Sequence, residues 1–532
     1  MESTAVNHTQ HTENVQALQA LNEQLRETVE QKDEKIQSLE QQLNWFKRQL
    51  FGEKSEKRDM TDNPYQQTIA DLLNELPEVP ERPAEEKQAI SYLRGKAKKN
   101  FLEGSPDDSG LRFDESVPVE EIVLSAPELE GPDAKDYEVI GQKTVYRLAQ
   151  RPTSHVVLKY TRPVIKKKST QQVITTQAPA NVLDKSFADV SFLAGLLLDK
   201  FLYHLPLYRQ HQRLETNGIR MARSTLSNLV KRSIELLKPI YQAQLRHILL
   251  SRVLAMDETP IKAGRKKKGK MNRAYFWPIY GDQDEVCFTF SRSRGMQHIL
   301  DQLGEFDGTL VTDGYGAYEK FSKKSQLLTH AQCWVHCRRQ FEEAKEAEPE
   351  AVAIALAYIG RLYEHEAHLR DASLSGKEKL TYRTAHSQPV VEAFFGWCHE
   401  QRQRIDLIKS NPLSKALAYT MKRQQELKVF LSDPEVPMDT NHLERALRVI
   451  PMGRKNWNFC WTEIGAEHVG IIQSLLVTCK LHSVNPYEYL VDVLQRVSIH
   501  PASLVEELTP REWQTRFSDS PLRSDLENLV GG

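Results

Sequence analysis

The sequence lacks several features that define large classes of protein. Six cysteines are spread over 532 residues, which excludes a disulfide scaffold and favours a reducing compartment. Basic and acidic residues number 71 and 72, so the net charge of -1 gives no sign of an anionic partner, and such a partner has to be recognised from local clusters. No basic segment followed by an apolar run opens the chain, so no signal peptide is expected.

Long apolar runs are missing as well. The most apolar stretch, residues 190–208, is interrupted by Asp199, Lys200 and His204, which disfavours a membrane span. The remaining composition is globular, with 40% hydrophobic and 27% charged residues, over a length that suggests three or four domains. These observations predict a soluble, cytoplasmic, multidomain protein with no membrane partner.

An apolar heptad runs from Leu18 to Leu50. β-Branched residues at one core position and leucines at the other are typical of a parallel dimer. A long helix packed on its own domain is the alternative, but the intervening residues are almost all polar or charged, which favours a dimerising coiled coil over 15–52. The core positions proposed for dimerisation are Leu25, Val29, Ile36, Leu39 and Leu43.

Two segments of different character follow the heptad. Residues 53–116 mix proline, glycine and charged residues without sustained periodicity and predict a linker. Residues 117–180 contain short β segments at 137–140, 144–148 and 155–160, which predict a small β module.

Residues 187–247 change to helical spacing and contain a candidate helix-turn-helix. A first helix is expected over 207–214, a turn at Asn217-Gly218, and a second helix after Ala222. A plain helical hairpin is the alternative, and the spacing alone does not separate the two. In a helix-turn-helix, the residues around the start of the second helix that would contact DNA are Arg220, Arg223, Ser224 and Thr225.

Residues 250–345 alternate strands and helices. Three consecutive strands are expected within 251–260, 274–282 and 285–294, followed by a helix, a fourth strand near 308–318, a helix, and a fifth strand that runs into a helix. This order is typical of a ribonuclease-H-like core within a multidomain α/β chain. The remaining segments are predicted as a helical insertion (346–430), the completion of the core (431–465), and a C-terminal helical segment with a tail (466–532).

Two aspartates stand at the ends of predicted strands. Asp257 and Asp313 each follow an apolar run, and in adjacent strands their carboxylates would point into one pocket. Hard oxygen ligands of this kind suit Mg²⁺ better than zinc, although either aspartate alone could simply cap a turn. The candidate for a third acid is Glu444, near the start of a helix that Asp439 could cap, and a surface pair with Arg448 is the alternative for it.

The motifs MDETP, VTDGYGAY, DTNHLERALR and GRKNWNF, with LNWFKRQLFGEKSEKR after the heptad, resemble the large transposase of the insertion sequence 66 family. The resemblance covers the chain from about residue 15 to 500. It implies a DDE triad on a ribonuclease-H-like core, with Asp257, Asp313 and Glu444 as catalytic residues and metal ligands. It also implies phosphoryl transfer with two Mg²⁺ or Mn²⁺ ions, which would cleave DNA at the ends of the element and join the freed 3′ ends to target DNA. The partners implied are DNA, a second copy or a higher oligomer, and small co-encoded accessory proteins, at the bacterial nucleoid.

The sequence departs from the family pattern in two places. Members of the family usually carry a zinc-binding cysteine cluster, but residues 117–178 contain no cysteine, so no zinc is expected there. The segment FCWT after Asn458 stands where small residues are more usual. A further metal set could be built from His330, Cys333, His336 and Cys337, but their spacing within one strand–helix junction favours core and supporting roles.

Local basic clusters would contact phosphates. Two of them cover residues 162–168 and 265–270, the second of which could equally be a solvated loop. Trp457 could stack on a base or be buried in the core. The third basic cluster consists of Arg445, Arg448, Arg454 and Lys455.

Two rival functions remain: a nuclease that cuts without joining, and a DNA-binding dimeric regulator whose catalytic core is unused.

Overall fold

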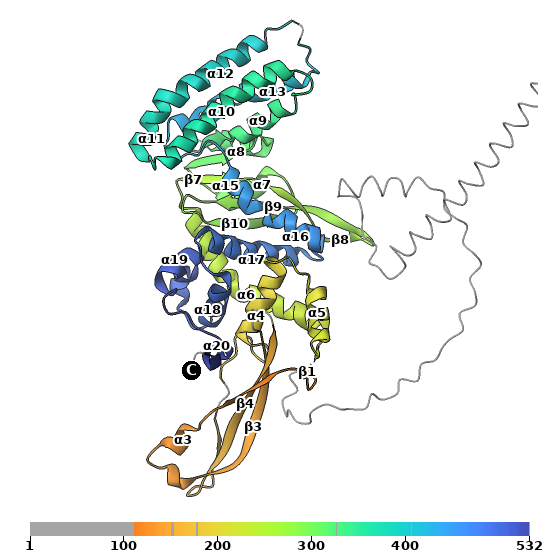
Figure 1. Cartoon of the computed structure of the whole chain (residues 1–532), viewed down its shortest axis with the longest axis vertical. Helices are drawn as coiled ribbons and strands as arrows, with labels where there is room; N and C mark the ends of the chain where they lie inside the picture. The colour runs from red at the N-terminus through yellow and green to blue at the C-terminus, as the bar shows by residue number, and fades with distance from the viewer. Residues whose placement is uncertain (1–110, 151–153, 177–178, 326, 406, 531–532) are drawn as a thin grey trace, which may run out of the picture. The chain divides into compact units, whose positions relative to one another are not determined.

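The computed structural model describes residues 111–150, 154–176, 179–325, 327–405 and 407–530, and it shows a mixed α/β chain with three sheets and many helices (Figure 1). The predicted coiled coil over 15–52 and nearly all of the predicted linker lie outside the described residues. None of the helices within the described ranges combines the length and the apolar character needed to cross a membrane.

A four-stranded sheet forms the small β module. Strand β2 (Val119–Val123) pairs parallel with β4 (His155–Lys167), and β3 (Tyr137–Gln150) and β5 (Val173–Thr175) pair antiparallel with β4. The two segments expected at 137–140 and 144–148 are one strand of 14 residues, because a register shift between Val139 and Gly141 lets the pairing continue. Two short turns, α3 (Pro127–Glu130) and η1 (Ala134–Asp136), precede β3.

The C-terminal tail is folded against this module. In helix α20 (Asp525–Val530), Leu526 is buried in an apolar cluster with Ala149, Val156 and Leu158. The hydroxyl of Tyr160 donates to Asp525 Oδ2 over 2.5 Å. The last helix therefore seals one face of the β module.

Three helices follow the module: α4 (Val190–Phe201), α5 (Leu207–Thr216) and α6 (Arg223–Ile248). The structure contains both helices of the predicted helix-turn-helix, and Gly218 takes a φ of +80° in the turn between them. Strand β6 (Ile219–Arg220) follows that turn and pairs with β1 (Arg112–Phe113), so the end of the predicted linker is structured. Helix α6 continues for 26 residues and packs against the central sheet.

The central sheet has the strand order β10-β9-β7-β11-β12. Strand β9 runs antiparallel to both β10 and β7, whereas β11 runs parallel to both β7 and β12. These strands are β7 (Val253–Met256), β9 (Lys270–Tyr280), β10 (Val286–Ser291), β11 (Thr309–Thr312) and β12 (Thr329–Gln332).

A sixth strand, β8 (Thr259–Lys267), pairs with β9 and was not among the expected strands. Its basic residues suggested a loop, but Ile261 and Ala263 are buried at every second position, which is the alternation of a half-buried strand. Arg265 and Lys266 of the predicted basic loop therefore lie on a strand. Around the sheet lie α7 (Met296–Leu303), α8 (Gly316–Lys324) and α9 (Trp334–Glu342).

Residues 346–430 are helical, as expected. The elements are α10 (Pro349–Asp371), α11 (Gly376–Tyr382), the π-turn η2 (Arg383–Ser387), α12 (Gln388–Gln401), α13 (Pro412–Lys422), α14 (Gln424–Lys428) and η3 (Val429–Leu431). Arg383 is fully buried, pairs with Glu366, and donates to the carbonyl oxygens of Phe430 and Val436. This guanidinium ties the insertion to the segment that re-enters the core.

The chain returns to the sheet through α15 (Asn441–Leu447), α16 (Val449–Trp457) and α17 (Glu463–Leu481), and it ends with α18 (Pro486–Arg496), η4 (Ala502–Leu508), α19 (Pro510–Arg516) and α20. Helix α17 is buried over most of its length and packs on β10 and α6. Apart from Lys267–Lys270, the described residues belong to one compact unit.

Candidate active site

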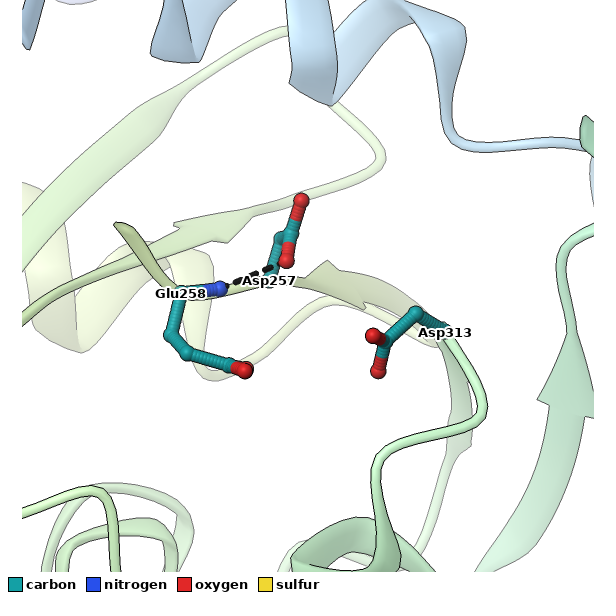
Figure 2. A group of neighbouring side chains, drawn as sticks. All are labelled: Asp257, Glu258 and Asp313. Atoms are coloured by element: carbon teal, nitrogen blue, oxygen red, sulfur yellow. Dashed lines mark hydrogen bonds between the residues drawn. The ribbon is translucent and has the colours of Figure 1, made fainter. Parts of the chain in front are cut away.

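The two predicted aspartates lie at neighbouring strand ends. Asp257 follows β7 and Asp313 follows β11, and these strands are parallel neighbours with Ala255 opposite Val311. The carboxyl ends of parallel strands open at the same edge of a sheet. One oxygen from each of Asp257, Glu258 and Asp313 lies within 4.8 Å of the others, and Figure 2 shows these side chains gathered around a common space.

Glu258 is the member of this cluster to which the sequence analysis assigned no role. Its Oε1 accepts from Arg294 Nε at 2.7 Å and its Oε2 accepts from the Tyr318 hydroxyl at 3.0 Å. The Arg294 guanidinium lies 3.9 Å from the centre of the Tyr315 ring, and the Tyr315 hydroxyl donates to the Arg294 carbonyl. The acidic residue directly after Asp257 was the available signal, but its partners, Arg294 and Tyr318, come from two other segments.

The cluster is electrostatically strained. Burial raises the pKa of the Asp257 carboxyl to about 7, against the opposing effect of the hydrogen bond from the Glu258 amide. The negative charges of Asp313, Glu258 and Glu444 raise this pKa further. Burial, and then the charge of Asp313, also raises the pKa of Glu258, while Arg294 lowers it. Three carboxylates thus share a buried space with one cation held on Glu258.

The turn after Asp313 is held from both sides. Asp313 Oδ1 accepts from the Tyr315 amide at 2.8 Å. On the other side, Arg423 Nη2, just beyond the end of α13, donates to the Gly314 carbonyl at 2.9 Å. A Cβ atom at Gly314 would lie 2.5 Å from the Tyr419 hydroxyl oxygen, so only glycine allows this close approach. The helical insertion therefore supports the strand end that carries Asp313.

Glu444 lies near this cluster but outside the 4.8 Å group. Its charge acts on Asp257, and its Oε1 lies 3.8 Å from His336 Nε2 and 3.9 Å from Arg339 Nη2. Thr440, and not Asp439, stands at the N-cap of α15, while Asp439 accepts from the Asn441 amide at 3.0 Å.

Tertiary hydrogen bonds bring Glu444 to the sheet. The amide and hydroxyl of Thr440 both donate to Cys333 Sγ at 3.3 Å, and the Trp334 amide donates to the Met438 carbonyl. These bonds join the start of α15 to the end of β12. The long separation along the chain is thereby closed by a short junction in space.

The histidines and cysteines of that junction pair with protein groups. His330 Nε2 lies 2.9 Å from Thr312 Oγ1, and Cys337 Sγ lies 3.2 Å from Thr420 Oγ1. His336 faces Glu444, and burial lowers its pKa. Within the described part of the chain, the group of three or more acidic, histidine or cysteine side chains close enough to hold a metal is the cluster at Asp257. The histidines and cysteines of the junction therefore do not form a metal site together.

The predicted DNA-contacting residues fall on two surfaces. Arg220, Arg223 and Ser224 are exposed around the start of α6, and Thr225 is half-buried. Arg445 on α15, Lys455 on α16 and Arg448 between the two helices are exposed. Arg454 is half-buried and donates to the Pro260 carbonyl at 2.6 Å. Trp457 is half-buried, and its indole ring packs closely over Gly453, where an added Cβ would lie 2.7 Å from the indole Nε1. This packing favours burial of the ring over stacking on a base.

The donor set fits a divalent cation. Carboxylate oxygens are the ligands that Mg²⁺ and Mn²⁺ prefer, and the raised pKa of Asp257 shows a site with too little positive charge. Asp257 and Asp313 could hold such an ion. A third ligand could come from Glu444 on helix α15 or from Glu258 beside Asp257.

Comparison with known proteins establishes the class. Residues 185–468 match the model of the Transposase IS66 family, residues 474–511 match the IS66 C-terminal element, and residues 38–122 match the Transposase C of IS166 homeodomain. The first match alone covers more than half of the chain, so the class of protein is a transposase, which acts on DNA. The chain belongs to the IS66 family.

Curated relatives share this sequence over most of their length. The uncharacterized protein y4hP of Sinorhizobium fredii is 28% identical over 397 residues, covering 70% of this chain and 71% of the relative. From the same organism, the uncharacterized protein y4jD is 29% identical, covering 64% and 69% of the two chains. The uncharacterized protein y4qI is 26% identical, covering 70% and 71%.

Proposed function

We propose that the protein is a DDE-type DNA transposase, which cleaves DNA at the ends of an insertion sequence and transfers the freed strands into target DNA. The observation that carries the proposal is the meeting of the Asp257 and Asp313 carboxylates at the ends of adjacent parallel strands, with Glu444 close enough to act electrostatically on Asp257. Family membership supports the same reading.

The strand order supports a ribonuclease-H-like catalytic core. Three strands that pair antiparallel are followed by two that pair parallel, in the order β10-β9-β7-β11-β12. The first parallel pair, β7 and β11, carries the two aspartates. In this interpretation, residues 250–345 and 431–465 form the core, and residues 346–430 are an insertion that holds the Asp313 turn.

We assign the third carboxylate to Glu444 and a positioning role to Glu258. Both oxygens of Glu258 already accept hydrogen bonds from Arg294 and Tyr318. Glu444 has looser neighbours, at 3.8 and 3.9 Å, and a half-buried side chain. A carboxylate without short protein partners has lone pairs available for a cation.

The chemistry would be phosphoryl transfer. Two Mg²⁺ or Mn²⁺ ions, when bound to Asp257, Asp313 and Glu444, would supply activation of a hydroxyl nucleophile and stabilisation of the leaving oxygen. The chain itself contributes the fixed placement of these carboxylates. Arg294, whose side chain is 43% exposed, is held on the Tyr315 ring beside the cluster, where its guanidinium can bond a phosphate.

Matched variants test the proposal. Mg²⁺-dependent cleavage and strand transfer would be measured on linear DNA that carries the ends of the element, for wild type, Asp257→Asn, Glu444→Gln and Glu258→Gln. We expect Asp257→Asn and Glu444→Gln to fold, bind DNA and lose activity by at least about a thousandfold, whereas Glu258→Gln retains measurable activity. Near wild-type rates for Glu444→Gln, with a complete loss for Glu258→Gln, would move the third ligand to Glu258.

The same assays separate the rival functions. A nuclease would release the ends of the element without joining them to a target. A DNA-binding regulator would bind the ends and cleave nothing in Mg²⁺ or Mn²⁺.

A separate experiment tests the proposed dimer through residues 15–52. The mass of the full chain, measured by light scattering, would be compared with that of a variant carrying Leu25→Lys and Ile36→Lys. Binding of an added accessory protein would be seen as a further increase in mass.

A further inference from the structure

An exposed stripe with three basic residues begins directly after Glu444. Helices α15 and α16 are separated only by Arg448, which itself has helical backbone angles. The side chains of Arg445, Arg448, Met452 and Lys455 are exposed, and their spacing of three, four and three residues places them on one face. Glu444 is the acidic residue of these two helices, so the charges on the face beyond it are all positive.

Two aromatic residues, the half-buried Phe459 and the exposed Trp461, stand beyond the end of this stripe. Asn458 closes α16 with a φ of +59°, and Phe459, Cys460 and Trp461 follow it in the chain. The rings of Phe459 and Trp461 meet edge to face with their centres 5.1 Å apart. Trp461 is 62% exposed, which is unusual because tryptophan is highly buried on average.

The backbone of this segment is fixed on both sides. Cys460 forms a bridge with Ala263 of β8, with its amide donating to the Lys262 carbonyl and its carbonyl accepting from the Gly264 amide. Cys460 is buried, whereas Phe459 before it is half-buried and Trp461 after it is exposed. Thr462 then caps α17 by accepting from the Gly465 amide at 2.9 Å. The aromatic pair is thus a rigid platform.

The platform lies beside β8, the strand that leads away from the active site. Strand β8 begins directly after Asp257 and Glu258, and Ala263 is five residues beyond Glu258. At about 3.3 Å per residue, the distance along the strand is roughly 15 to 20 Å. Neighbouring phosphates of one B-DNA strand advance by about 3.4 Å, so the platform corresponds to roughly five nucleotides from the reacting phosphate.

We propose that Phe459 and Trp461 form a stacking site for one nucleobase that is unpaired from the DNA close to the cleavage position. Lys455 and Arg448 bind the phosphates that lead to it. Every nucleobase offers a π-face, so a base stacks on an exposed indole without regard to its identity. The positive charge along α15 and α16 complements a polyanion, and the nearest carboxylate of the segment, Glu463, is held by Arg292. This inference rests on the proposed function, because it takes the substrate to be the DNA that the acid cluster cleaves.

The test is a cycle between the side chain and the base. Binding constants would be measured by fluorescence anisotropy in Ca²⁺, without cleavage, for duplexes carrying an end of the element with one abasic site moved through the ten positions around the cleavage site. The proteins are wild type, Trp461→Leu, Trp461→Tyr and, as a control for an exposed apolar neighbour, Ile464→Ala. Ile464 is 54% exposed.

For wild type and Trp461→Tyr, we expect an abasic site at one position to weaken binding roughly 5- to 100-fold, the range that loss of one base–aromatic stack produces. Trp461→Leu should bind intact DNA with that same loss and should be indifferent to the abasic site. Ile464→Ala should behave as wild type.

Three results would overturn the stacking site. The first is wild-type affinity of Trp461→Leu for intact DNA. The second is a loss of affinity, measured against wild type, that is as large on abasic DNA as on intact DNA, because the side chain and the base would then act independently. The third is a change of oligomeric mass on light scattering without a change in DNA affinity, which would make Trp461 a contact between copies of the chain. Failure of the proposed function is distinct, since it would appear as absent cleavage in Mg²⁺ while the binding cycle is read in Ca²⁺.

Discussion

The strained carboxylate at Asp257 makes a quantitative prediction about stability. Its folded-state pKa is about 7, against an ordinary value of 3.8, chiefly because the group is buried. Between these two values the folded chain holds a proton that the unfolded chain has released, so the free energy of unfolding falls as the pH rises through this window. The gap of about three units corresponds to about 4 kcal/mol at about 1.4 kcal/mol per unit, and relaxation of the buried site reduces this to about 2 kcal/mol.

Replacing Asp257 with asparagine removes the ionisable group and keeps its shape. We expect Asp257→Asn, in the presence of EDTA, to be more stable than wild type by about 2 to 4 kcal/mol at pH 8. The difference should shrink steadily on the way to pH 4, where both side chains are neutral. Urea unfolding, followed by circular dichroism at each pH, measures this difference.

Asp307→Asn is the matched control, because Asp307 is an exposed aspartate near the same sheet. Its stability should follow wild type at every pH to within about 0.5 kcal/mol. Equal unfolding midpoints for Asp257→Asn and wild type at pH 8 would refute the claim that the cluster is strained, and with it the argument that the site lacks positive charge.

Three further predictions address the surroundings of the cluster. Mg²⁺ at about 100 times its dissociation constant should stabilise wild type by about 2.7 kcal/mol in a thermal unfolding assay, and it should leave Asp313→Asn unchanged; an equal gain in both proteins would place the ion elsewhere. Gly314→Ala should reduce cleavage at least about tenfold, because its Cβ would lie 2.5 Å from the Tyr419 hydroxyl oxygen. The control Gly316→Ala, with no atom within 4 Å of its Cβ, should cleave normally. Equal cleavage rates for the two variants would show that the Asp313 turn tolerates displacement. Arg383→Ala should destabilise the chain by about 3 to 5 kcal/mol in urea, because it removes a fully buried guanidinium and leaves the half-buried Glu366 without its partner. The control Arg370→Ala, at an exposed position, should cost less than about 0.5 kcal/mol.

Local sequence patterns predicted most of the elements around the site. The apolar runs before Asp257 and Asp313 are β7 and β11, and the helix predicted between the third and fourth strands is α7. Such patterns are readable because burial on one face imposes a period of two or 3.6 residues on the sequence itself. Strand β8 was missed because its buried positions, Ile261 and Ala263, alternate with Pro260, Lys262 and Gly264, and proline and glycine are uncommon in strands.

The composition of the cluster was less accessible. Glu258 is adjacent to Asp257 in the sequence, but its partners Arg294 and Tyr318 come from a loop and a helix whose approach no spacing predicts. Likewise, Trp457 and Trp461 lie four residues apart in one aromatic segment. Burial of the first and exposure of the second follow from where Gly453 and β8 approach the chain.

By itself, the sequence determined the α/β character of the chain, the positions of the strand-end aspartates, and membership of the IS66 family, since these depend on residue order and local periodicity. The tertiary structure decided which acids share a space, that the insertion holds the Asp313 turn through Arg423, and that Thr440 joins Glu444 to the sheet through Cys333. Those features depend on contacts between residues about 55 to 110 positions apart. Their pairing is set by how whole helices and strands pack, and it leaves no periodic pattern in the sequence.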